Sequence, residues 1–224
     1  VNWIDPRFGL GYKFDDKSTL RFALGIFRQI PDPRLFNPVD GNPNLKPMKA
    51  NHIIASYEYQ FDESNSFRLE VYRKDYKNLP MENDELNYDN SGYGFANGID
   101  VIYKGTLPFG INGWISYGYI NTKRLWMDFD SYTSSSFDIT HNISIVAKYS
   151  LSEKFQLGLT AKYATGRPFT PVSSSTYLSN YNVYEPVYSA TNSSRFPDYK
   201  RVDMRLTYFE IGRASCRERV SNCV

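Results

Sequence analysis

Histidine and acidic side chains are the residues best suited to chemistry in this sequence, and few of them are grouped. His52 and His141 are its two histidines, and Asp138 stands three residues before His141. A D-x-x-H spacing can supply metal ligands, but residues three apart in an extended strand point to opposite faces. We therefore predict that Asp138 and His141 mark the start of a strand or tether a loop, and that they hold no metal ion.

Two further aspartates, Asp128 and Asp130, could offer carboxylate oxygens to calcium. Counted from Asp128, however, the sequence lacks the glycine at the sixth position and the glutamate at the twelfth that an EF-hand loop needs. The serine runs 134–136 and 173–175 have no base nearby in the sequence, and no Gly-rich phosphate loop is present. We predict that the protein is not an enzyme, and we assign no catalytic, cofactor-binding or metal-binding residue.

Tyrosines alternate with serine and asparagine in the segment 167–200, and this mixture is typical of recognition surfaces. Flat amphipathic rings with adaptable hydrogen bonds would suit a sugar, a catecholate siderophore or a peptide. The same tyrosines could instead pack on neighbouring loops, and both interpretations stay open. The tyrosines are Tyr177, Tyr181, Tyr184, Tyr188 and Tyr199.

The composition excludes several classes of protein. The 224 residues include 26 Lys plus Arg and 24 Asp plus Glu, so the formal net charge is only +2 and nucleic acid is not an expected partner. Mean hydropathy is −0.51, and no apolar run approaches the roughly 20 residues that a membrane-spanning helix needs. Aromatic residues make up 17% of the chain, with 19 Tyr and 15 Phe. A membrane barrel fits this composition, because its strands hide a polar side in the interior.

Apolar residues recur at every second position through most of the chain, which predicts β-strands. The opposite side of these strands is polar and charged. In a barrel this side would line the lumen and pair with itself or with a plug; its members include Arg7, Arg21, Glu58, Arg68, Glu70, Asp100, Lys104, Lys162, Asp203 and Arg205. We expect about nine strands, near 6–14, 19–29, 53–61, 67–74, 99–104, 115–119, 142–149, 155–163 and 201–209.

The connections between these strands alternate between short and long. This rhythm is typical of a transmembrane barrel, which has short turns on one side of the membrane and long loops on the other. We therefore predict an all-β fold, an antiparallel up-and-down meander that is an incomplete piece of a large transmembrane β-barrel. The alternative is a soluble, glycan-binding β-sandwich. The expected short connections are 15–18, 62–65, 105–111 and 152–153, and the long ones are 30–49, 78–92, 124–137 and 167–200.

Three blocks of sequence resemble the TonB-dependent outer-membrane receptor family, in the style of its Bacteroidetes members. Gly41–Phe61 (GNPNLKPMKANHIIASYEYQF) is similar to the family's NPxLKPE loop and following strand, with Met48 in place of Glu. Phe137–Val172 resembles its D-x-x-H, strand, turn, strand, GRPxTP pattern. Arg195–Phe209 (RFPDYKRVDMRLTYF) resembles its P-x-Y-x-R-x-D-x-R strand.

This resemblance implies a bacterial outer-membrane barrel of 22 strands, closed by a plug domain. It also implies partners: outer-membrane lipid, the TonB complex and plug through parts outside this chain, and a scarce small solute such as a siderophore, cobalamin, glycan or peptide. We expect this chain to be a fragment, about strands 12–20 of such a barrel, without plug, TonB-contacting box, signal peptide or terminal strand. The alternative within the outer membrane is a porin or a surface adhesin barrel without energy coupling.

The last residues differ from the rest of the chain. Residues 210–220 (EIGRASCRERV) resemble a translated sequencing adapter, and both cysteines, Cys216 and Cys223, lie in the tail. We expect residues 1–209 to form the partial barrel and 210–224 to be a non-native tail. The alternative is a genuine C-terminal segment with a cysteine pair or metal site, although two cysteines seven apart match no familiar ligand spacing.

Overall fold

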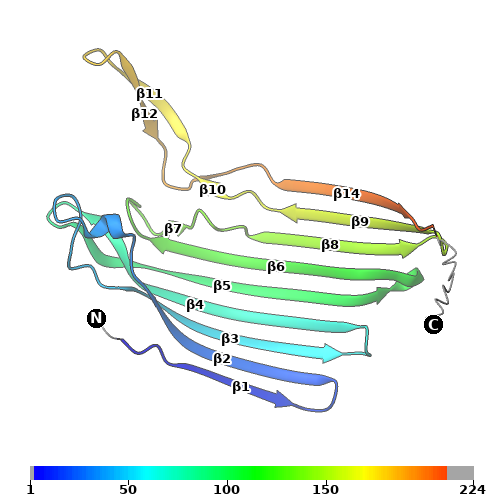
Figure 1. Ribbon diagram of the computed structural model, residues 1–224. Helices are drawn as coiled ribbons and strands as arrows, with labels where there is room; N and C mark the ends of the chain where they lie inside the picture. The colour runs from blue at the N-terminus through cyan, green and yellow to red at the C-terminus, as the bar shows by residue number, and fades with distance from the viewer. Residues whose placement is uncertain (1–2, 211–224) are drawn as a thin grey trace, which may run out of the picture.

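A computed structural model describes residues 3–210 of the chain. Its main feature is one antiparallel, ten-stranded sheet in the order β1-β2-β3-β4-β5-β6-β8-β9-β14, with the short β7 paired to β6 (Figure 1). The strands of this sheet are β1 Arg7–Lys13, β2 Ser18–Gln29, β3 Met48–Gln60, β4 Ser66–Asn83, β5 Asn87–Leu107, β6 Ile111–Leu125, β7 Thr133–Ser134, β8 His141–Ser150, β9 Phe155–Ala164 and β14 Tyr199–Tyr208.

Smaller elements lie in the connections. Two small two-stranded sheets precede β14: β10 (Pro168–Phe169) pairs with β13 (Ser194–Arg195), and between them β11 (Val172–Leu178) and β12 (Val183–Tyr188) form a hairpin. Single 3-10 turns cover Pro33–Phe36 and Pro108–Gly110. No helix in the described part of the chain is long and apolar enough to cross a membrane.

The pairing register places the apolar residues of neighbouring strands on one face of the sheet. Leu24 of β2 lies opposite Phe8 of β1 and Ile53 of β3, and Leu206 of β14 lies opposite Leu157 of β9. Within residues 3–210 no second sheet covers this face, and Leu206 is 63% exposed. An uncovered apolar face of this size excludes the β-sandwich alternative, because a sandwich buries that face in its core. The all-β, incomplete-barrel prediction is confirmed.

Tight turns join the strands at one end of the sheet, on the right in Figure 1. In the β1–β2 turn the carboxylate of Asp15 accepts the backbone N–H groups of Lys17 at 2.8 Å and Ser18 at 2.6 Å. The carboxylate of Asp62 plays the same part between β3 and β4. These backbone hydrogen bonds hold the pKa of Asp15 below its usual value, since they stabilise the ionised form. Aspartate therefore fixes these turns through its side chain.

The region 78–92 differs from its prediction as a loop. It is a hairpin, because β4 continues to Asn83 and β5 begins at Asn87. The register shifts on both sides of Leu79, which lies opposite Gly92. Each such bulge moves the following residues to the other face of the strand, so the alternation that marks a strand is interrupted there. Two other long connections also hold strands, since β7 lies in 124–137 and β11 and β12 lie in 167–200.

The sheet does not close on itself. Among residues 3–210, β1 pairs with β2 alone and β14 with β9 alone, so each keeps one free edge. The main sheet thus matches an incomplete barrel wall.

Candidate functional site

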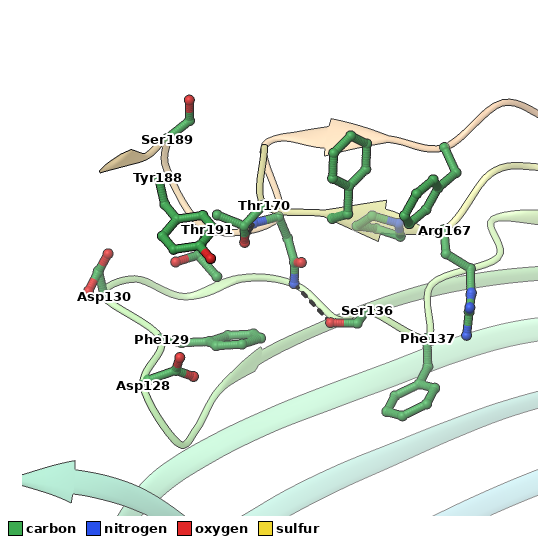
Figure 2. Close-up of a pocket in the computed structure, with 14 residues that line it drawn as sticks. Asp128, Phe129, Asp130, Ser136, Phe137, Arg167, Thr170, Tyr188, Ser189 and Thr191 are labelled. Atoms are coloured by element: carbon green, nitrogen blue, oxygen red, sulfur yellow. Dashed lines mark hydrogen bonds between the residues drawn. The ribbon is translucent and has the colours of Figure 1, made fainter. Parts of the chain in front are cut away.

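A cavity of about 830 Å³ lies at the end of the sheet opposite to the tight turns. It is lined by two segments, one between β6 and β8 and the other between β9 and β14 (Figure 2). The lining combines aromatic rings with charged and hydroxyl groups, as ligand sites do. The lining side chains include Asp128, Phe129, Asp130, Phe137, Arg167, Phe169, Tyr188 and Phe196.

Asn192 joins the two segments at the floor of the cavity. Its side-chain amide donates to the carbonyl of Ser134 at 2.7 Å and to the hydroxyl of Ser136 at 3.4 Å, the contact dashed in Figure 2. Its backbone N–H donates to the hydroxyl of Thr170 at 3.0 Å. Asn192 has a φ of 53°, a left-handed conformation that asparagine tolerates better than most residues. One asparagine thereby connects two segments through residues that are 56 positions apart in sequence.

Arg195 forms a second connection between the two segments. Its guanidinium donates to the backbone carbonyls of Asp138 at 3.0 Å and Gly166 at 2.9 Å. It also forms an ion pair of 3.5 Å with the Asp138 carboxylate, whose side chain is 4% exposed. The Asp138 carboxylate accepts a further hydrogen bond from the hydroxyl of Thr140 at 2.8 Å. Asp138 therefore tethers a loop, which is one of the two roles predicted for it.

His141 lies in a different environment from Asp138. Its Nδ1 is 2.9 Å from the hydroxyl of Tyr117, and its backbone N–H donates to the hydroxyl of Thr165 at 3.0 Å. The D-x-x-H residues thus have separate partners. In the described region, residues 3–210, no group of three or more His, Cys, Asp or Glu side chains could hold a metal ion.

Asp198 fixes the place where the chain returns to the sheet. Its carboxylate accepts hydrogen bonds from the Tyr163 hydroxyl at 2.8 Å and the Gly166 N–H at 3.1 Å. The tyrosine hydroxyl, and then the Gly166 N–H, lower the pKa of Asp198. A Cβ atom on Gly166 would lie 1.6 Å from the carbonyl oxygen of Phe196, so no larger residue fits there without a backbone shift. The GRP and FPDY sequences therefore meet in one compact node.

The family comparison decides which side of the sheet faces lipid. The family model described as "TonB dependent receptor-like, beta-barrel" matches residues 2–217. The chain belongs to this family. TonB-dependent receptor barrels lie in the bacterial outer membrane, so the apolar face of the sheet faces lipid, the polar face lines the lumen and the cavity end is extracellular. The family consists of transport receptors and not of enzymes.

Solved structures with the same fold are TonB-dependent receptors. The ferric-catecholate import receptor Fiu from Escherichia coli K12 has a TM-score of 0.70 and 17% identity, covering 92% of this chain and 28% of that one. The FrpB iron transporter from Neisseria meningitidis has a TM-score of 0.64 and 11% identity, covering 93% and 32%. The siderophore receptor PiuA from Acinetobacter baumannii has a TM-score of 0.63 and 14% identity, covering 90% and 29%. No curated protein matches the sequence.

The chain therefore spans less than a third of the length of these three receptors. The family match also favours a TonB-dependent receptor over the alternatives of a porin or a surface adhesin. The suggested adapter sequence and both cysteines lie at or beyond the limit of the described residues, and that interpretation stays a prediction.

The tyrosine-rich segment of the receptor forms the β11–β12 hairpin, which projects away from the sheet (Figure 1). Tyr177 and Tyr184 are cross-strand partners with ring centroids 5.1 Å apart. Tyr181 and Tyr184 are 76% and 72% exposed. Of the five tyrosines, Tyr188 alone lines the cavity.

Sequence reasoning missed the phenylalanines of the cavity. Phe169 and Phe196 stack with centroids 4.4 Å apart, and both belong to segments at the base of the hairpin. Asp128 and Asp130, considered only as calcium ligands, also line the cavity. The available signal was the presence of aromatic residues in the long connections, close to the strand ends. That these residues line one cavity depends on the contacts of Asn192 and Arg195, which the sequence does not reveal.

The lumen face of the receptor carries the charges expected from the sequence. Arg21 pairs with Glu58 across β2 and β3, and Arg68 pairs with Glu70 along β4 at 2.7 Å. These ion pairs are partly exposed and each contributes little to stability. A smaller cavity of about 320 Å³ lies on this face, lined by residues that include Arg68, Glu70 and Asp100.

Proposed function

We propose that this chain is part of an importer that captures a scarce solute in the extracellular cavity and releases it into a plugged lumen. TonB would supply the energy from the inner membrane, through the plug. The observation that carries the proposal is the aromatic and polar cavity between two cross-linked segments at the extracellular mouth. Loops on a rigid scaffold usually carry binding, and a cavity of about 830 Å³ is large enough for a drug-sized solute.

The lining suggests the chemistry of the solute. The phenylalanines and Tyr188 offer ring faces, while Arg167 and the two aspartates offer opposite charges. A solute with planar rings and several polar groups would use both. Fiu is described as a ferric-catecholate import receptor, which makes an aromatic iron chelate our first candidate. Glycans, peptides and cobalamin are the other candidates from the sequence.

A second cavity supports passage into the lumen. It has a volume of about 610 Å³ and is lined by residues that include Phe27, His52, Arg124 and Trp126. Phe27, His52 and Arg124 share the strand parity of the polar, lumen-facing side chains, whereas Arg28 and Lys49, which also line this cavity, have the opposite parity. Phe137 lines both cavities. A solute leaving the extracellular cavity past Phe137 would therefore enter a site of similar character.

The test is solute uptake by cells that produce the complete receptor. Uptake of a ferric catecholate should depend on TonB, while binding at the cell surface should persist without TonB. Phe129→Ala with Phe169→Ala should weaken surface binding about tenfold or more, at about 1 kcal/mol or more for each ring contact. Phe109→Ala is the matched control, because Phe109 is 90% exposed in the β5–β6 turn at the other end of the sheet. Uptake that is independent of TonB would instead indicate a passive channel.

A further inference from the structure

Three cations form one row on the lipid-facing side of the sheet, above its apolar belt. Arg28 of β2 lies opposite Lys49 of β3, and Lys49 lies opposite Lys77 of β4. These positions continue the parity of the apolar residues, so their side chains point outward with those residues. Like charges directly opposite each other on a sheet are destabilising. We call Arg28, Lys49 and Lys77 the basic row.

The protein neutralises only part of this charge. Arg28 pairs with the carboxylate of Asp5 and donates to the carbonyl of Ile4 at 2.7 Å. Among residues 3–210, Lys49 and Lys77 take part in no ion pair. The nearby Arg73 is already matched by Asp75 at 2.7 Å. Two adjacent lysines therefore face outward, and neither has an ion-pair partner among residues 3–210.

Aromatic residues fix the depth of the basic row. Lys77 lies opposite Tyr93 of β5, whose ring stacks on that of Tyr132 at 5.1 Å. Phe95, two residues further along the same face, lies under the guanidinium of Arg73 at 5.5 Å. Aromatic rings of this kind gather where the hydrocarbon ends and the headgroups begin. The lysines thus lie at the level of the outer-leaflet headgroups.

We propose that the basic row binds the phosphate groups of an outer-leaflet glycolipid headgroup. A phosphate between Lys49 and Lys77 would remove their mutual repulsion and accept hydrogen bonds from both ammonium groups. Basic clusters at membrane level bind anionic headgroups, each lysine contributing about a fivefold gain in affinity. This site is separate from the solute cavity, so it stands whether or not the proposed import function holds.

The test uses the complete receptor in detergent, mixed with diphosphoryl lipid A, with dephosphorylated lipid A or with phosphatidylglycerol, and analysed by native mass spectrometry. The receptor should retain diphosphoryl lipid A over the dephosphorylated form. Lys49→Gln with Lys77→Gln should reduce this retention by about tenfold or more. Lys49→Arg with Lys77→Arg should keep it, which separates loss of charge from loss of fold. Lys13→Gln with Lys154→Gln, at the opposite end of the sheet, is the matched control and should also keep it.

Several outcomes would overturn the proposal. Equal retention by the receptor and the double glutamine variant would show that these lysines do not bind the headgroup. Equal retention of the phosphorylated and dephosphorylated lipids would show that the basic row does not recognise phosphate. Displacement of the lipid by millimolar inorganic phosphate would assign the site to a free anion. Stronger retention of phosphatidylglycerol would show a general preference for anionic lipid and not for the glycolipid.

Discussion

Two extracellular segments of this receptor are built in opposite ways. The segment between β2 and β3 is docked on the long β4–β5 hairpin through side-chain hydrogen bonds, and its Leu35 and Leu45 are buried. The β11–β12 hairpin has no buried residue in either strand. One segment behaves as an extension of the barrel wall, while the other is held by its own pairing and by the node at its base.

Hydrogen bonds show the same contrast. Asn90 on the β4–β5 hairpin accepts the backbone N–H of Lys46 at 2.7 Å and donates to the carbonyl of Lys46 at 3.1 Å. Asn42 donates to the carbonyl of Tyr88 at 2.7 Å. In the β11–β12 hairpin the tyrosine hydroxyl of Tyr177 bonds within its own hairpin, to Asn182. The NPNLKP sequence is thus a docking element, and the tyrosine-rich sequence is a projecting one.

The largest expected effect comes from removing a buried side chain of the docked segment. Leu45→Ala should lower the local unfolding free energy of residues 30–47 by about 2–4 kcal/mol, because it leaves a cavity at a buried position. Val183→Ala, at an exposed position of β12, should change the local unfolding free energy of residues 172–188 by less than about 0.5 kcal/mol. Hydrogen exchange of backbone amides measures both. Equal effects of the two variants would show that the segments do not differ in packing.

The next effect comes from releasing the base of the projecting hairpin. Arg195→Met removes two hydrogen bonds to carbonyls and the ion pair with Asp138. We expect the local unfolding free energy of residues 133–138 and 165–170 to fall by about 1–2 kcal/mol, seen as faster amide exchange there. The expected fall is small because Arg195 is partly exposed. Residues 30–47 should be unaffected. Faster exchange there would mean that the two extracellular segments are coupled.

The smallest effect is a pH dependence of the same node. The pKa of Asp198 is lowered first by the Tyr163 hydroxyl and then by the Gly166 N–H. Its stabilising contribution is therefore complete above the ordinary aspartate pKa of about 4 and is lost as the pH falls through the lowered value. Protection of the Gly166 amide, corrected for intrinsic exchange, should fall only below about pH 4. Tyr163→Phe should move that fall to higher pH; an unchanged profile would contradict the assignment.

Alternation predicted the barrel wall because lipid and lumen impose a period of two on each strand. It failed at the β4–β5 hairpin, where the bulges next to Leu79 break that period. The cavity was not predicted, since Phe129 and Phe196 line it from two segments that are joined by hydrogen bonds between residues far apart in the sequence. Asp138 and His141 were predicted to mark the start of a strand or to tether a loop. In the structure Asp138 contacts Arg195 of the other segment, and His141 is the first residue of β8.

The free edges of β1 and β14 have a consequence for biogenesis. Each edge presents a row of backbone N–H and C=O groups, and in hydrocarbon every unsatisfied group costs several kcal/mol. A wall with two such edges cannot rest in a bilayer alone, so β1 and β14 must acquire neighbouring strands before or during insertion. Pairing of both edges with further strands would leave no open backbone edge in the hydrocarbon.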